Sequence, residues 1–158
     1  MGQPTYLEIN LSGKSFTDTE LLPLIKKELA STGVNPGSII FEITETSIIE
    51  NILTAQNFIS EVKAMGCHFA LDDFGVGFSS FNYLKFLPVD YLKIDGSFIV
   101  NLPQNPVDQH LVKAMVEVAN GLGLKTIAEY VNSEETVCLL RKFGVGYAQG
   151  YYIGKPYA

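Results

Sequence analysis

Six short apolar segments alternate with longer stretches whose apolar residues recur at helical spacing. The first, residues 6–11, alternates apolar and polar side chains with the period of two that is typical of a half-buried strand. The other five apolar segments are residues 39–43, 68–72, 91–95, 125–129 and 147–149. We therefore predict six strands joined by helical connections.

The connecting stretches carry helix start and stop signals. Thr17 and Glu20 have the spacing of a capping box, which predicts the start of a helix that Gly33 ends. Residues 48–65 have apolar side chains at helical spacing and predict one helix closed by Gly66. A short helix is expected around residues 80–87.

Two further helices are predicted nearer the C-terminus. The first has an apolar side formed by Leu111, Ala114, Met115, Val118 and Leu122. The second begins after Ser133 as its N-cap and stops at Gly144.

Repeated alternation of strand and helix predicts an α/β fold with a parallel sheet and right-handed crossovers. The sheet is either open and doubly wound or closed into a barrel. No glycine-rich GxGxxG turn follows the first strand, which counts against a dinucleotide-binding fold. The Gly13-Lys14-Ser15 segment is not a phosphate-binding P-loop, because Glu8 stands where that motif needs its first glycine.

Composition narrows the class of protein. The chain has 158 residues, 47% of them apolar, which suits one domain with a substantial core. A net charge of −6 disfavours a broad DNA or RNA interface. No apolar run approaches the ~20 residues of a membrane span, the first residues do not resemble a signal peptide, and Cys67 and Cys138 suggest reduced thiols. We expect a cytoplasmic protein without membrane contact.

Each predicted strand ends at or beside a polar side chain suited to ligand binding or proton transfer. Carboxyl ends of parallel strands form the ligand face, so we expect these side chains to converge. A single one of them is readily explained as a turn, cap or ion-paired residue, whereas six together favour a functional site. They are Asn10, Glu42, Asp72 with Asp73, Lys93 with Asp95, Glu129, and Gln149.

The candidate ligands offer oxygen atoms only, which favours Mg²⁺ or Mn²⁺ over zinc. The adjacent Asp72 and Asp73 suit two metal ions, the usual device for displacement at phosphorus. Lys93 is a fixed cation that either holds an attacking or phosphate oxygen or only neutralises the acids. The pattern thus favours metal-dependent phosphoester hydrolysis.

Histidine and aromatic residues carry weaker signals. His68 is in register to line the sheet interior, but a hydrogen-bonded core or rim histidine is favoured, and we expect His110 to be exposed on a helix. Phe74, Phe78, Phe81, Tyr83 and Phe86 suit base stacking, although packing is favoured for most of them. Residues 147–157 are rich in tyrosine and suit a wall for a planar base.

The motifs resemble those of the EAL-domain family of bacterial cyclic di-GMP phosphodiesterases. They occur in the family's order from near residue 5 to the C-terminus. The matching segments are Asn10-Leu11-Ser12, Phe41-Glu42-Ile43-Thr44-Glu45, Leu71-Asp72-Asp73-Phe74-Gly75-Val76-Gly77-Phe78-Ser79-Ser80, Leu92-Lys93-Ile94-Asp95, Ile127-Ala128-Glu129, and Gln149-Gly150-Tyr151 followed by Pro156.

This resemblance implies a TIM-type (β/α)8 barrel and two Mg²⁺ or Mn²⁺ ions that open cyclic di-GMP to linear pGpG. It assigns one metal ion to Asn10, Glu42 and Asp72, and the second to Asp72 and Asp73. It further makes Lys93, Glu129 and Asp73 catalytic residues, gives substrate contacts to Gln149, Asn10, Lys93 and Pro156, and lets Glu45 brace the loop after Asp73. In the family this loop couples substrate, metal and dimerisation.

The sequence also departs from the family pattern. It has no Glu-Ala-Leu tripeptide and starts at the expected third strand, so residues 1–158 correspond to a partial EAL domain with about six strands of an incomplete barrel. Tyr130 and Asn132 stand where the family has glycine and glutamate, and Val76 stands where a smaller or hydroxylic residue is usual.

These departures imply impaired hydrolysis. The missing strands predict either a fragment of a longer parent protein or association into a homodimer or larger oligomer. An upstream sensory or cyclase domain in the parent protein is compatible with the family resemblance, but the sequence does not reveal it. Two alternatives to a phosphodiesterase stay open: a cyclic di-GMP receptor without activity, and a protein-interaction module.

Overall fold

The computed structural model describes residues 6–77 and 81–155. Its six strands follow one another in the sheet in chain order, and the pairs β1–β2, β4–β5 and β5–β6 are parallel. The predicted α/β fold with six parallel strands is therefore confirmed. The strands are β1 (Leu7–Leu11), β2 (Ile39–Thr44), β3 (His68–Phe74), β4 (Tyr91–Ile94), β5 (Lys125–Ala128) and β6 (Tyr147–Ala148).

Helical segments connect each strand to the next. In the part of the chain that the structure describes, none of them is long and apolar enough to span a bilayer. The α-helices are α1 (Leu21–Thr32), α2 (Glu45–Ile49), α3 (Ile52–Ala64), α4 (Pro106–Gly121) and α5 (Glu134–Phe143). The 3-10 helices are η1 (Gly13–Thr17), η2 (Pro36–Ser38), η3 (Phe81–Phe86), η4 (Gly96–Phe98) and η5 (Leu102–Gln104).

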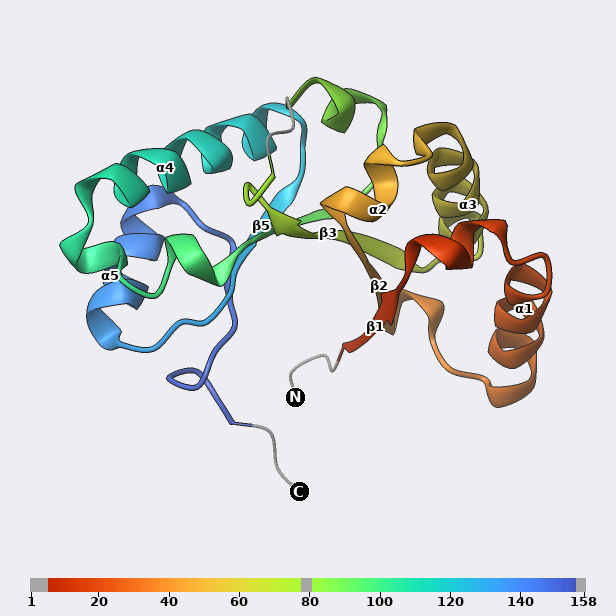
Figure 1. The fold of residues 1–158 in the computed structure, drawn as a ribbon. Coiled ribbons are helices and arrows are strands. Elements are labelled where there is room, and N and C mark those ends of the chain that lie inside the picture. Colours follow the sequence, from red (N-terminus) through yellow and green to blue (C-terminus); the bar gives the residue numbers. More distant parts are fainter. Residues whose placement is uncertain (1–5, 78–80, 156–158) are drawn as a thin grey trace. The chain divides into compact units, whose positions relative to one another are not determined.

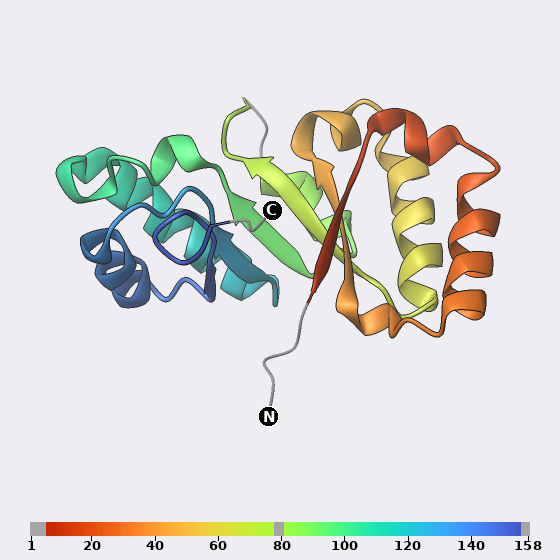
Figure 2. The same ribbon diagram turned by 90° about the horizontal axis from the view of Figure 1, so that it is seen from below.

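The chain divides into two compact units, with the division inside β3 after Leu71. The first unit contains the residues up to Leu71 together with Phe86–Asp90, and the second contains Asp72–Lys85 and the residues from Tyr91 onward. In the first unit, α1 and α3 lie side by side (Figures 1 and 2). In the second, α4 packs against β5 and α5.

An aromatic cluster and a partly buried ion pair stabilise the first unit. The rings of Phe16 and Phe69 both pack on Phe58, with centroid separations of 5.7 and 6.3 Å. Asp90 accepts hydrogen bonds from Lys63 Nζ (2.7 Å) and from the backbone N–H of Phe69 (2.9 Å). His68 Nδ1 lies 3.5 Å from the same carboxylate, which fits the favoured interpretation of a polar rim histidine.

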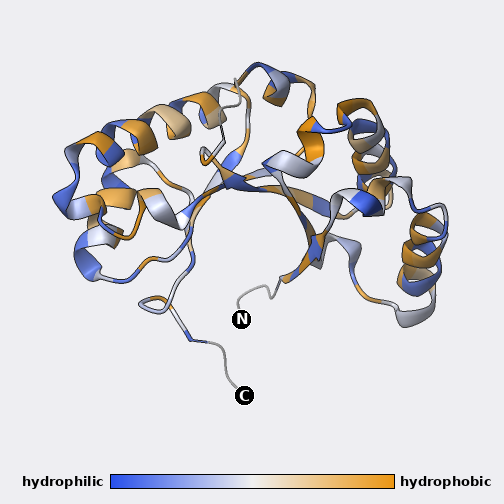
Figure 3. Cartoon of the chain, viewed as in Figure 1, coloured by the Kyte–Doolittle hydropathy of each residue, from blue (hydrophilic) through white to orange (hydrophobic). Residues whose placement is uncertain are grey.

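The buried face of α4 differs from the predicted one. Val112, Met115, Val116 and Ala119 form the buried stripe, at the i, i+3, i+4, i+7 spacing of one helix face. Leu111, which we placed on that face, is 42% exposed. The prediction was wrong by about one residue in phase because α4 also carries apolar residues outside its buried stripe, such as Val107 and Leu111. Apolar and polar colours alternate along its ribbon (Figure 3).

Two other helix predictions were wrong. Thr17 does not cap a helix: its hydroxyl donates to the Lys14 carbonyl oxygen at the end of η1, and α1 starts at Leu21. The expected single helix over residues 48–65 is two helices, because Asn51 Oδ1 accepts hydrogen bonds from Thr54 N and Oγ1 and thereby starts a new helix, α3.

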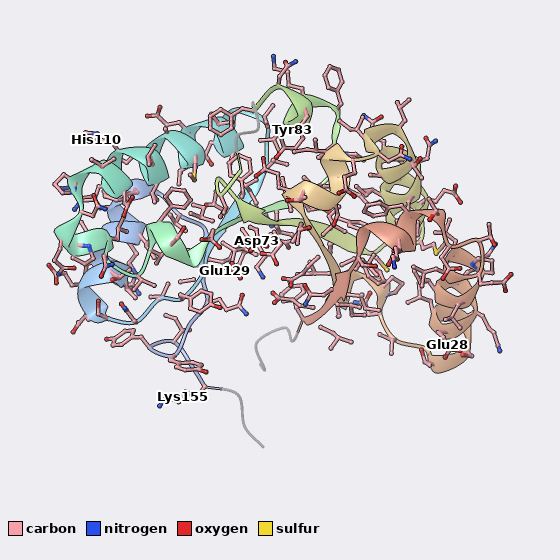
Figure 4. All side chains as sticks on the ribbon, viewed as in Figure 1. Glu28, Asp73, Tyr83, His110, Glu129 and Lys155 are labelled. Atoms are coloured by element: carbon pink, nitrogen blue, oxygen red, sulfur yellow. The ribbon has the colours of Figure 1, made fainter. Side chains whose placement is uncertain are left out.

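The remaining helix boundaries agree with the sequence signals. Ser133 Oγ accepts a hydrogen bond from Thr136 N at the start of α5. Gly33 and Gly144 end α1 and α5 in the left-handed conformation. His110 lies exposed on α4, as expected (Figure 4).

Candidate active site

The carboxyl end of β3 presents two adjacent carboxylates. The backbone turns sharply here, because Asp73 has a φ of 55°. Its N–H donates a hydrogen bond of 2.9 Å to Asp72 Oδ1, which stabilises this left-handed conformation locally. Asp72 is half-buried and Asp73 is exposed, so the first carboxylate is held by the sheet and the second faces solvent.

A buried cation lies on the neighbouring strand. Lys93 on β4 is only 2% exposed, and its Nζ lies 2.9 Å from Glu129 Oε1 and 3.7 Å from Asp72 Oδ1. A buried ammonium needs such partners, because its desolvation is otherwise costly. Asp95, two residues further on, instead caps η4 by accepting a hydrogen bond from Ser97 N.

Three carboxylates converge in the second unit. Oxygen atoms of Asp72, Asp73 and Glu129 lie within 4.8 Å of one another, and Figure 4 shows Asp73 and Glu129 close together. Burial raises the pKa of Glu129, while its hydrogen bond to Lys93 and the charge of Lys93 oppose the rise. Partial burial also raises the pKa of Asp73, and the charges of Asp72 and Asp95 add to the rise.

Backbone hydrogen bonds fix the ends of β5 and β6 next to this cluster. The N–H of Glu129 donates to Ile94 O, and the N–H of Gln149 donates to Ala128 O at 2.8 Å. Glycine is required at position 150, where φ is 154° and a β-carbon would lie 2.3 Å from Val131 N. This close approach keeps Gln149 beside the end of β5.

Asn10 and Glu42 are brought together in the first unit. They are register partners at the carboxyl ends of β1 and β2, and Glu42 is 4% exposed. Glu45, also 4% exposed, begins α2 directly after β2. The assignment of Asn10 and Glu42 to a shared metal ion and of Glu45 to loop bracing stays a prediction, and Pro156 lies outside the described residues.

An open cavity of about 450 Å³ adjoins the carboxylate cluster through Glu129. Tyr130 and Tyr151 supply exposed aromatic surface, with 67% and 73% of each residue accessible. The sequence did not single out Val100 and Gly154, because neither carries a reactive group. The cavity is lined by Val100, Glu129, Tyr130, Val131, Asn132, Gln149, Gly150, Tyr151 and Gly154.

Among the described aromatic side chains near residues 74–86, Phe74 is packed in the core and two others are exposed. Phe74 is 2% exposed, and its ring centroid lies 5.5 Å from that of Phe81. Phe74 therefore agrees with the favoured packing interpretation, whereas Phe81 and Phe86 are 45% and 59% exposed. Phe78 lies outside the described residues.

The donor set fits a hard divalent cation. Asp72, Asp73 and Glu129 offer only carboxylate oxygens, and these lie close enough together to repel one another strongly without a counter-charge. Lys93 is one counter-charge to these three carboxylates, with its Nζ 2.9 Å from Glu129 and 3.7 Å from Asp72. A group of this type can hold a metal ion and polarise a phosphate ester.

Comparison with known proteins identifies the family. The model of the EAL domain matches residues 1–156. The chain is 41% identical over 150 residues to the cyclic di-GMP phosphodiesterase PdeB of Shewanella oneidensis, covering 95% of this chain and 18% of that protein. The chain spans about a fifth of the length of the curated relatives it matches.

Solved structures agree with this assignment. The PaMucR phosphodiesterase in complex with c-di-GMP is 33% identical, with a TM-score of 0.89, and the match covers 96% of this chain and 61% of that one. The FimX EAL domain from Pseudomonas aeruginosa bound to c-di-GMP is 30% identical, with a TM-score of 0.90 and coverages of 96% and 62%. The motifs, the parallel α/β fold and these matches agree, and the chain belongs to the EAL domain family.

Proposed function

We propose that this chain provides the catalytic surface of a cyclic di-GMP phosphodiesterase that produces linear pGpG. Water adds to one phosphorus, the bond from that phosphorus to the 3′ oxygen breaks, and the 3′ oxygen takes a proton. The observation that carries the proposal is the group of three carboxylates, Asp72, Asp73 and Glu129, with the buried Lys93 against it. The names of the relatives and structural neighbours supply the substrate.

Two Mg²⁺ or Mn²⁺ ions are part of this proposal. Asp72 and Asp73 would hold one ion, and Asp72 with Asn10 and Glu42 would hold the other. Bound divalent cations supply charge neutralisation at the phosphate and acidify water. The all-oxygen donor set supports these metals, because Mg²⁺ and Mn²⁺ prefer carboxylate and amide oxygens.

Lys93 and Glu129 act together beside the metal ligands. Lys93 Nζ holds Glu129 Oε1 at 2.9 Å, so the carboxylate keeps one orientation toward the reacting phosphate. Its other oxygen accepts a hydrogen bond from the attacking water. The ammonium also lies 3.7 Å from Asp72 and provides fixed positive charge where negative charge grows on the phosphoryl oxygens.

The test is product analysis by anion-exchange chromatography after incubation with cyclic di-GMP. We expect pGpG to form slowly with Mg²⁺ or Mn²⁺, because the departures from the family pattern imply impaired hydrolysis. We expect no product in EDTA, and loss of product in the Asp73→Asn and Lys93→Met variants. A Glu117→Gln variant on the exposed surface of α4 is the matched control and should behave as wild type. Product that forms equally in EDTA would overturn the metal-dependent proposal.

A second function is favoured by two residues beside the cluster. Tyr130 and Asn132 replace the family's glycine and glutamate, and Asn132 Nδ2 donates a hydrogen bond to Val100 O instead of offering a carboxylate. A receptor that binds cyclic di-GMP without opening it would use such a modified site. Calorimetry that detects binding, together with chromatography that detects no pGpG in Mg²⁺ or Mn²⁺, would establish the receptor.

The setting of the whole protein is also a proposal. A cytoplasmic location agrees with the cysteines, since Cys67 is buried and Cys138 is exposed, and both are free thiols. Homodimerisation and an upstream sensory or cyclase domain remain predictions from the family resemblance.

A further inference from the structure

Tyr130, next to Glu129, has an unusual backbone conformation. Its φ is 55°, and Asp73 is the other non-glycine residue with positive φ among residues 6–77 and 81–155. Asp73 has a short polar side chain that tolerates this region, whereas a bulky tyrosine does not. Such strain is energetically unfavourable and persists where the surroundings enforce it.

Neighbouring hydrogen bonds enforce the conformation of Tyr130. On one side the N–H of Glu129 donates to Ile94 O at 3.2 Å, and on the other the N–H of Val131 donates to Gln149 O at 3.0 Å. Val131 is fully buried, so the chain cannot relax there without exposing an apolar side chain. The ends of β4, β5 and β6 thus clamp both neighbours of Tyr130.

The ring of Tyr130 packs directly against the backbone of Gly96. A β-carbon built at Gly96 would lie 2.3 Å from Tyr130 Cδ2 and 2.7 Å from Tyr130 Cγ. These separations are too short for a real β-carbon, so any side chain at position 96 would have to displace the ring. The ring therefore rests against the bare backbone at the start of η4. Despite this contact Tyr130 remains 67% exposed, so much of its surface is available to a ligand.

That surface belongs to the cavity that adjoins the carboxylate cluster. Its volume of about 450 Å³ lies within the usual range for small-molecule sites, about 300–1,000 Å³. Tyr151 adds a second exposed aromatic side chain, and Gln149 and Asn132 add amides. The Asn132 amide donates to Val100 O through its nitrogen, which leaves its oxygen as an acceptor.

We infer that Tyr130 is a substrate-binding residue on which one guanine base of cyclic di-GMP stacks. This inference rests on the proposed function and adds a specificity residue to it. An exposed ring held in a fixed orientation loses little entropy on binding a planar base. The amide oxygens of Gln149 and Asn132 in the same cavity match the N1–H and N2–H₂ donors of guanine, and Glu129 connects the base site to the reacting phosphate.

Titration with cyclic di-GMP in EDTA, where the proposed hydrolysis does not run, tests the inference. Tyr130→Gly should weaken binding about tenfold, within the range for loss of one base–aromatic stack, and should raise Tm because glycine relieves the positive φ. Tyr130→Phe should bind like wild type. Gly96→Ala should also weaken binding, because its β-carbon displaces the ring. Tyr152→Gly is the matched control, since Tyr152 is exposed in the same C-terminal segment but does not line the cavity.

A spectroscopic readout separates stacking from a structural role. The chain contains no tryptophan, so Tyr130→Trp introduces a single reporter. Cyclic di-GMP should quench its fluorescence with the same midpoint as binding, whereas the Tyr152→Trp control should stay unquenched.

Three outcomes decide the matter. A Tyr130→Gly variant that binds cyclic di-GMP as tightly as wild type would overturn the inference while leaving the proposed function intact. The same holds if Tyr130→Gly hydrolyses cyclic di-GMP in Mg²⁺ with unchanged KM. Wild-type chain that neither binds nor hydrolyses cyclic di-GMP would overturn the proposed function, and with it this role for Tyr130.

Discussion

Removing the charge of Asp73 should stabilise the chain without metal and destroy its response to metal. Asp73→Asn keeps the size of the side chain, and asparagine tolerates the φ of 55° at this position. The substitution takes one negative charge out of a group whose oxygens lie within 4.8 Å of one another. In the metal-free protein, the charge of Asp73 is therefore expected to lower the free energy of unfolding.

The magnitude follows from the separation and the exposure. Two unit charges 4.8 Å apart in water repel by about 0.9 kcal/mol. The water value applies because Asp73 is exposed, and the nearby Lys93 offsets part of the repulsion. We expect Asp73→Asn to gain about 0.5–1 kcal/mol in EDTA, which is a rise in Tm of about 1–4 °C.

The pH dependence has a defined sign. The folded-state pKa of Asp73 is raised by burial and by the charges of Asp72 and Asp95, so the folded state holds this proton more tightly than the unfolded chain does. Wild-type stability should therefore fall as pH rises from about 4 through the raised pKa. Asp73→Asn should lose this part of the pH dependence, and its advantage over wild type should vanish below pH 4.

Metal should reverse the order of stability. At a hundred times its Kd, a cation that binds only the folded state adds about 2.7 kcal/mol. Wild type should gain this in Mg²⁺ or Mn²⁺, whereas Asp73→Asn should gain little. Thermal melts by circular dichroism in EDTA and in MgCl₂ measure both effects, with Glu117→Gln as the control. An Asp73→Asn variant that is less stable than wild type in EDTA, or equally stabilised by Mg²⁺, would refute the reasoning.

Substitutions at four positions probe the buried charge and the helices, and urea denaturation measures each. Lys93→Met should destabilise the metal-free chain by about 3 kcal/mol, because it strands the Glu129 carboxylate beside other acids, and a loss under 1 kcal/mol would contradict the ion-pair geometry. Ser133→Ala should cost about 1 kcal/mol through loss of the cap to α5, whereas Ser133→Asp should retain most of it. Val112→Ala should cost about 2 kcal/mol and Leu111→Ala under about 0.5 kcal/mol, and the reverse order would show that the buried face of α4 is misassigned.

The sequence by itself determined the order of strands and the identity of the polar residues at their ends. Strand–helix alternation leaves few topologies, because crossovers between parallel strands are right-handed. Parallel strands also share one ligand face, so Asp72, Lys93 and Glu129 could be assigned to a common edge from their positions at three strand ends. Caps such as Ser133 and stops such as Gly144 act locally and were therefore readable as well.

The helix faces and helix breaks needed the tertiary structure. Helix α4 has apolar residues outside its buried stripe, and only packing against neighbouring elements of the second unit (β4, β5, η4, η5 and α5) selects Val112 over Leu111 for burial. Thr17 and Glu20 have the spacing of a capping box. In the structure, however, the Thr17 hydroxyl donates to the Lys14 carbonyl oxygen at the end of η1. Side chains that bond the backbone in more than one way cannot be assigned from spacing alone.

The tertiary structure alone decided which atoms meet at the site. The sequence gives no distance, so the 2.9 Å contact of Lys93 with Glu129 and the raised pKa of Asp73 come from folding. Tyr130 could be recognised in the sequence as a departure from a motif, but its positive φ and its packing against Gly96 arise from long-range backbone hydrogen bonds. Residue type and order are local properties, whereas proximity between distant residues exists only once the chain has closed its loops and buried its strands.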